Sequence, residues 1–104
     1  MTNYPSWALQ PSTEDLVETF GRTVYDRGLD YANQRRVEIV LTAEKVVTAQ
    51  VRGSGYSSYR TSVVNHDAGG LTSICSCPVA SSCEHAVAVL LHIQNEARLE
   101  QTPH

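Results

Sequence analysis

Cys75-Ser76-Cys77-Pro78 and, after a short spacer, Cys83-Glu84-His85 form the stretch of sequence that decides how the chain folds. The spacing is Cys-x-Cys-x5-Cys-x-His. Residues two apart on an extended segment point to the same face, so Cys75 and Cys77 can reach one ion. Cys83 and His85 stand where an apolar helix is expected to begin, and the backbone N–H groups there favour a thiolate.

Three thiolates and one imidazole complete a tetrahedral donor set, which is typical of structural zinc and leaves no position for a catalytic water. An iron–sulfur cluster usually takes four thiolates, and the chain has three cysteines. The alternatives are buried reduced cysteines beside a surface histidine, or a redox switch, which usually has Cys-x-x-Cys. We predict that one structural Zn²⁺ is bound by Cys75, Cys77, Cys83 and His85.

Length and composition indicate one small domain with 104 residues, 41% hydrophobic residues and a net charge of −3. An odd number of clustered cysteines does not fit a secreted disulfide scaffold and favours a reducing compartment. The apolar run Ala86 to Leu91 is far shorter than the roughly 20 residues of a membrane span. The first residues lack a basic stretch followed by an apolar one, so we do not expect a signal peptide. We expect a soluble, cytoplasmic protein without a membrane partner.

The chain divides into an extended N-terminal arm, residues 1–11, and a single zinc-binding domain, residues 12–104. Trp7 is the arm's one plausible anchor against the body. Ser12 followed by Asp15 predicts a helix cap, and a helix over Thr13 to Phe20 should follow.

A second helical stretch should run from Thr23 to Gln34, either continuous or as two short turns, because Gly28 costs about 1 kcal/mol inside a helix. From Arg36 the apolar period changes to two, which predicts strands joined by tight turns. Val37, Ile39 and Leu41 should share one face of the first strand. The expected strands are Arg36–Leu41, Lys45–Arg52, Tyr56–Val64 and Leu71–Cys75.

The last element should be a helix over Cys83 to Gln101. Its first two turns are apolar nearly all round, so either the domain buries them from both sides or one flank awaits a partner. His66 and His92 are either alternative metal ligands or polar surface residues. The predicted fold is α+β: an antiparallel β-meander of three to four strands with N-terminal helical segments and a C-terminal helix, clipped by one zinc.

The ligand motif and the apolar helix after it resemble the SWIM zinc-finger family, whose pattern is Cys-x-Cys, a variable spacer, then Cys-x-His. Upstream, Tyr25-Asp26-Arg27-Gly28-Leu29-Asp30-Tyr31 followed by Arg36-Val37 is similar to the aromatic-x-Arg-Gly-x-x-Tyr…Val stretch that often precedes this finger. The likeness covers about residues 17 to 93. It implies that Gly28 marks a turn or a close approach between the helical segment and the sheet, and that Arg27 is either structural or a phosphate contact.

The resemblance implies a DNA-binding or protein-interaction module, most like the N-terminal region of bacterial Swi/Snf-type helicase-like proteins. The chain departs from the pattern at Glu84, where the family commonly has lysine. It also contains no G-x-x-x-x-G-K-[ST] motif of an ATPase. The chain is therefore either a fragment of a longer protein, with a covalently linked helicase-like region as partner, or a stand-alone module.

Two functions are expected. We do not expect an enzyme, because the sequence has no catalytic constellation and the predicted metal site has no open position. No small-molecule substrate is expected either. The first is accessory DNA binding, weak and salt-dependent because of the net charge. Its candidate contacts are the basic residues on or near the strands: Arg35, Arg36, Lys45, Arg52 and Arg60. A mixed-charge solvated face is the alternative interpretation of these residues. The second function is protein interaction, with docking through Val87 and Leu91 of the last helix and through Trp7.

Overall fold

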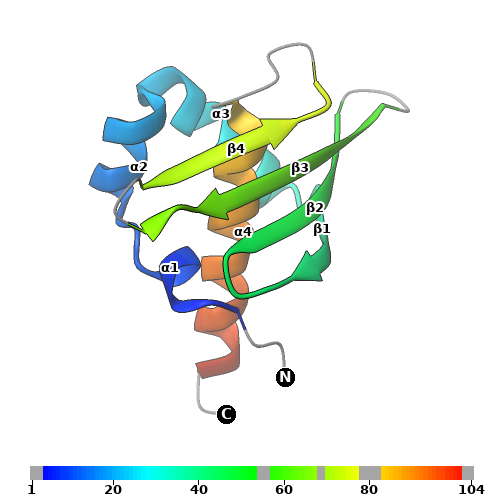
Figure 1. Ribbon diagram of the computed structural model, residues 1–104. Coiled ribbons are helices and arrows are strands. Elements are labelled where there is room, and N and C mark those ends of the chain that lie inside the picture. Colours follow the sequence, from blue (N-terminus) through cyan, green and yellow to red (C-terminus); the bar gives the residue numbers. More distant parts are fainter. Residues whose placement is uncertain (1–3, 54–56, 68–69, 78–82, 102–104) are drawn as a thin grey trace.

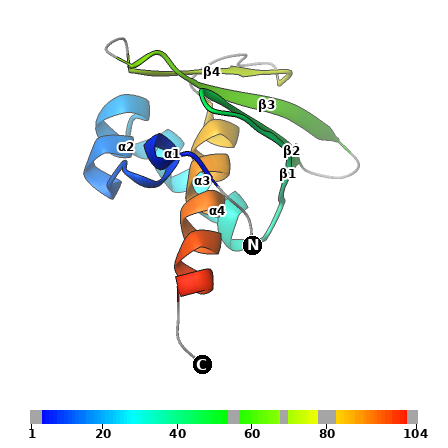
Figure 2. The same ribbon diagram turned by 60° about the horizontal axis from the view of Figure 1, so that its bottom comes forward.

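The computed structural model describes residues 4–53, 57–67, 70–77 and 83–101. Its helices lie on one side of a four-stranded sheet, and the other side carries no helix among these residues (Figures 1 and 2). The strands follow the order β1-β2-β3-β4, each antiparallel to the next, so the predicted α+β meander is confirmed. The elements are α1 (Ser6–Leu9), α2 (Thr13–Phe20), α3 (Arg22–Asn33), β1 (Val37–Thr42), β2 (Val46–Arg52), β3 (Ser58–Asn65), β4 (Leu71–Cys75) and α4 (Glu84–Gln101).

Helix α2 begins and ends where the local sequence predicts. The Ser12 hydroxyl accepts a hydrogen bond from the Asp15 N–H at 3.1 Å, and the Asp15 carboxylate accepts one from the Ser12 N–H at 3.0 Å. This capping box satisfies two donors at the start of the helix. Gly21 ends the helix with a φ of 92°, a left-handed conformation that glycine adopts without a Cβ penalty.

Helix α3 is continuous through Gly28, which settles the alternative between one helix and two turns. A Cβ atom at Gly28 would lie 2.5 Å from the Cβ and Cγ1 atoms of Val87 and 2.8 Å from the carbonyl oxygen of Glu84. The close approach is therefore between α3 and α4, and the expected approach to the sheet is wrong. The missing side chain lets the two helices pack at short range, which outweighs the intrinsic helix cost of glycine.

The first strand departs from the predicted alternation at one position. Ile39 pairs with Ala49 and Leu41 pairs with Thr48, so Val40 is an extra residue that forms a β-bulge. The bulge turns Leu41 away from the core, and the residue is 52% exposed. The expectation that Leu41 shares a buried face with Val37 and Ile39 is wrong for this reason. Tyr56, expected at the start of the third strand, lies outside the described residues.

The apolar start of α4 is the centre of the core. Ala86 to Leu90 are fully buried and Leu91 is 8% exposed, because α4 contacts α3 and all four strands. Each large aliphatic side chain buried in this way contributes roughly 1.5–3 kcal/mol. Val87 and Leu91 are therefore not a surface for a partner, and that expectation is corrected. None of the described helices combines the length and apolar character that a membrane crossing requires.

The N-terminal stretch expected as an extended arm contains one turn of helix, α1, whose Ala8 is fully buried. The Trp7 indole N–H donates to the Glu44 carbonyl at 2.7 Å, so Trp7 is an anchor as predicted. The Gln94 amide of α4 donates to the carbonyls of Ala8 at 3.3 Å and Pro11 at 3.0 Å. These long-range hydrogen bonds fix the stretch against α4. The division at residue 12 stays a prediction.

Candidate metal centre

The four predicted ligands come from the two elements that flank the spacer. Cys75 is the last residue of β4, and Cys77 follows two positions later. Cys83 directly precedes α4, and His85 is the second residue of that helix. All four side chains are buried, with exposed fractions between 1% and 6%. The spacer itself, residues 78–82, lies outside the described residues.

The four side chains converge on one point. Their donor atoms all lie within 4.8 Å of one another. The imidazole Nδ1 of His85 lies 3.5 Å from the Cys75 sulfur and 3.6 Å from the Cys83 sulfur, so Nδ1 is the nitrogen that faces the thiols. Two sulfur ligands on a tetrahedral zinc ion lie about 3.8 Å apart, given a Zn–S bond of about 2.3 Å. The observed spacing needs little adjustment to reach that geometry.

The chemistry of this donor set fits a structural zinc ion. The three cysteines are free thiols, and no carboxylate joins the group among the described residues. Soft sulfur donors with one imidazole select zinc over hard cations such as Mg²⁺ and Ca²⁺. The buried cluster can therefore hold one metal ion, and a zinc ion would connect the end of the sheet to the start of α4.

Burial opposes charge on these ligands when no cation is present. Desolvation raises the pKa of the Cys83 thiol to about 12, although the backbone N–H groups of Ala86 and His85 act in the opposite direction. We expected the helix start to ease ionisation of Cys83, but burial outweighs it. Burial also lowers the pKa of His85, while Glu84 raises it by a smaller amount. A bound dication would supply the positive charge that stabilises the thiolate.

Thr61 is a second-layer residue that the sequence analysis did not single out. Its hydroxyl lies 3.1 Å from the Cys75 sulfur, and Thr61 is fully buried. The two residues are direct cross-strand partners in β3 and β4. The sequence could have pointed to Thr61. Tyr59, Thr61 and Val63 alternate along β3 and so share one side of the strand, and Thr61 carries a hydroxyl between two larger side chains on that side. A hydrogen bond from a hydroxyl to a sulfur ligand stabilises the thiolate form and fixes its orientation.

Two tyrosines flank the ring of His85. The Tyr59 ring centroid lies 4.8 Å from that of His85, and the Tyr31 centroid lies 5.2 Å away. The guanidinium of Arg36 lies over the Tyr31 ring, 5.3 Å from its centroid. The buried Nε2 of His85 has no hydrogen-bond partner among the described residues. Because Nδ1 faces the sulfurs, this arrangement presents His85 as a ligand through Nδ1.

The other two histidines lie apart from the cluster. The His92 imidazole pairs with the Glu96 carboxylate at 2.6 Å and is partly buried. His66 is exposed, and its Nε2 lies 2.7 Å from the Thr72 hydroxyl. Neither belongs to the metal-ligand group found among the described residues.

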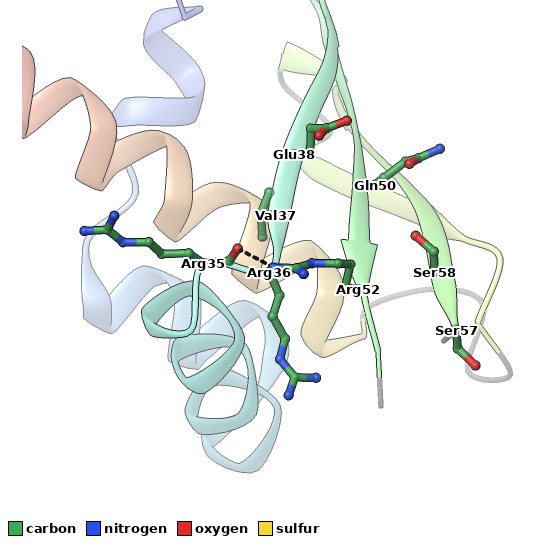
Figure 3. Close-up of a pocket in the computed structure, with 8 residues that line it drawn as sticks. All are labelled: Arg35, Arg36, Val37, Glu38, Gln50, Arg52, Ser57 and Ser58. Atoms are coloured by element: carbon green, nitrogen blue, oxygen red, sulfur yellow. Dashed lines mark hydrogen bonds between the residues drawn. The ribbon is translucent and has the colours of Figure 1, made fainter. Parts of the chain in front are cut away.

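The structure separates the five basic residues expected to contact nucleic acid. Arg35, Arg36 and Arg52 line a hollow of about 620 Å³ at one end of β1 and β2, together with Ser57 and Ser58. Figure 3 shows the guanidinium of Arg35 directed away from those of Arg36 and Arg52. Their charges therefore do not converge on one point.

Arg36 and Arg52 also have structural hydrogen bonds at this end. Arg36 donates to the Gly53 carbonyl at 3.1 Å, and Arg52 donates to the Arg35 carbonyl at 3.3 Å. The hydrogen bonds from Arg36 and Arg52 hold the start of β1 against the end of β2. Arg60 lies apart from them, exposed on β3 opposite Gln50 of β2.

Lys45 lies at the other end of β2, away from the arginines. Its ammonium pairs with the Asp67 carboxylate at 2.7 Å, and this hydrogen bond is the main reason that the pKa of Lys45 is raised. Its charge is locally neutralised in this way. The sequence alone could not separate Lys45 from the arginines, because its partner comes from a distant turn.

Comparisons of the chain with protein-family models, with curated proteins and with solved structures find no match.

Proposed function

We propose that this chain is a non-catalytic zinc-binding module of the SWIM type, in which one Zn²⁺ is part of the fold. The observation that carries the proposal is the convergence of three buried thiols and one buried imidazole within 4.8 Å. The Cys-x-Cys and Cys-x-His halves, with an apolar helix directly after His85, support the SWIM assignment. The four donors complete a tetrahedral shell, so a substrate would find no open position on the ion.

The ion's expected role is to hold β4 against α4. The thiols and the imidazole come from both sides of the spacer, and β4 is an edge strand that pairs with β3 alone among the described strands. Because the site forms only when the chain folds, binding energy becomes folding energy. Adding a strong chelator should therefore lower the melting temperature sharply, and readdition of zinc should restore it. A melting temperature unaffected by chelation would sink the proposal.

For the module's role we propose accessory DNA binding, in or beside a helicase-like or other DNA-processing protein. The support is a set of arginines at one end of the sheet, Arg35, Arg36, Arg52 and Arg60, none of which forms an ion pair with a described residue. The net charge of −3 and Glu84 next to the ligands oppose tight binding. Binding should therefore be weak, and because it rests on phosphate contacts it should weaken as the salt concentration rises.

A protein partner is the second candidate, and it is favoured by one observation on α4. Leu99 is 67% exposed near the end of α4, beside a hollow of about 530 Å³ that Ala32 and Arg35 also line. This part of α4 extends beyond the sheet (Figure 1). A large exposed aliphatic beside a hollow is a common feature of a docking site. Replacing Leu99 with serine should abolish such docking without changing zinc content.

A further inference from the structure

The side of the sheet that faces away from the helices, here termed the outer face, is not covered by any described helix (Figure 2). Val47, Ala49 and Val51 of β2 are fully buried, so the residues between them point outward. Three cross-strand pairs form its centre. They are Thr48 with Ser62, Gln50 with Arg60, and Arg52 with Ser58.

Charge is distributed unevenly between this outer face and the helices. Arg52 and Arg60 are exposed and form no ion pair with a described residue. Among the described strand residues Glu38 is the single acid, whereas α2 and α3 carry an acidic group of residues. That group is Glu14, Asp15, Glu18, Asp26 and Asp30. An acidic protein that has two arginines without a described carboxylate partner on this side presents a local surface complementary to a polyanion.

The other side chains of these three cross-strand pairs are polar and uncharged. Thr48, Ser58 and Ser62 are hydroxyl residues, and the Thr48 and Ser62 hydroxyls hydrogen-bond each other at 2.8 Å. No aromatic ring points outward from the described strands, because Tyr59 packs on His85 instead. Proteins that bind single strands usually stack bases on aromatic side chains. The outer face has charge and hydrogen-bond donors for phosphates but no platform for bases.

A duplex suits such a surface, because it hides its bases and presents its phosphates on the outside. Arg52 and Arg60 are diagonal neighbours on adjacent antiparallel strands, so their Cα atoms lie about 7–8 Å apart. Two flexible side chains at this spacing can contact different phosphates of one backbone. Arg35 turns away from the strands, and Arg36 is stacked on Tyr31, so neither is assigned to the contact.

We infer that the outer face binds the sugar–phosphate backbone of duplex DNA, independently of base sequence, through Arg52 and Arg60. This inference rests on the proposed DNA-binding function and adds to it the form of the nucleic acid and the surface that contacts it. With two phosphate contacts, the slope of log K against log salt should be about −2. Binding at low salt should therefore weaken by only about tenfold over a threefold rise in salt.

The test uses the full zinc-loaded chain and fluorescence anisotropy with a short DNA duplex and with one of its strands alone. The variant R52Q/R60Q is compared with R22Q/R98Q, which removes the same charge from exposed positions of α3 and α4, on the helical side of the sheet. We expect the duplex to bind more tightly than the single strand. R52Q/R60Q should lose at least about tenfold in affinity and most of the salt slope, and R22Q/R98Q less than about threefold. Zinc content and the circular dichroism spectrum check that each variant is folded.

Each contrary result has a separate meaning. If neither DNA form binds at low salt, both the proposed DNA-binding function and this inference are overturned. If the single strand binds as tightly as the duplex or more tightly, DNA binding stands and the inferred duplex contact is overturned. If both variant pairs lose the same affinity, the attraction is diffuse and the assignment to the outer face is overturned.

Discussion

The Thr61 hydroxyl lies 3.1 Å from the sulfur of Cys75, and the two residues are cross-strand partners in β3 and β4. Both are buried, so neither group has water as an alternative partner. The strand pairing that builds the sheet therefore also orients one of the four candidate ligands. This relationship links the stability of the β3–β4 hairpin to the metal centre.

Replacing Thr61 with valine keeps the shape of the side chain and removes the hydrogen bond. The affinity for zinc should fall by about 10-fold or more, in the range found when outer-shell partners of metal ligands are removed. Competition with a chromophoric chelator measures this. Thr61→Ser is the matched control and should retain most of the affinity, because the hydroxyl remains. Equal zinc affinities for the valine variant and the parent protein would show that Thr61 does not support the metal site.

Replacing Gly28 with alanine should destabilise the protein even though alanine is the better helix former. The new Cβ would lie 2.5 Å from the Val87 side chain and 2.8 Å from the backbone oxygen of Glu84. Separating two packed helices costs about 1–3 kcal/mol, which exceeds the gain of about 1 kcal/mol in helix propensity. Urea unfolding of the zinc-loaded protein measures the difference. Thr23→Ala, at an exposed position of α3, is the control and should change the free energy of unfolding little.

The pKa shifts of His85 and Cys83 define a pH window for the metal-free protein. Burial lowers the pKa of His85 from 6.5, so the unfolded chain takes up the proton first and stability falls as the pH drops below that value. Burial raises the pKa of Cys83 from 9.0 to about 12, so stability falls as the pH rises from 9.0 towards 12. The metal-free fold should be most stable between these limits.

Urea midpoints measured across the pH range after chelation test this window. His85→Gln should remove part of the acid sensitivity, because glutamine does not titrate. His92→Gln, which changes a histidine outside the cluster, should leave it in place. If the urea midpoint of the His85 variant falls at acid pH as much as that of the parent protein, His85 is not a cause of the acid sensitivity.

Zinc binding should release protons at neutral pH. The Cys83 thiol, with a pKa of about 12 in the metal-free protein, is protonated there and must lose its proton to become a ligand. The apparent binding enthalpy should therefore vary with the ionisation enthalpy of the buffer, with a slope of at least about one proton per zinc ion. Calorimetry in two buffers provides the measurement. An enthalpy that is the same in both buffers would mean that no thiol is deprotonated on binding.

Local signals in the sequence predict most of the fold. The Ser12–Asp15 pair predicts the start of α2, and the turn formers that precede Leu71 predict the start of β4, which has the expected bounds Leu71–Cys75. The ligand group was also predictable, because local geometry places two donors in each of Cys-x-Cys at a strand end and Cys-x-His at a helix start, and only five residues separate the two halves.

Features that depend on contacts between distant residues were not predictable. The bulge at Val40 is a property of the pairing between β1 and β2, and Gly28 meets α4 because of how the two helices cross. The contact between Thr61 and Cys75 requires the register of two strands, which the local sequence does not give. The raised pKa of Cys83 depends on how deeply the finished fold buries the thiol.

Metal analysis of the purified protein tests the central claim most directly. Protein prepared without added metal should contain about one zinc ion per chain, and a cobalt-substituted sample should show the strong absorption of a tetrahedral thiolate site. Cys83→Ala and His85→Ala should each weaken zinc binding severely, whereas His66→Ala, outside the cluster, should not. A protein that is folded and contains no zinc, or that keeps its zinc in both ligand variants, would contradict the account.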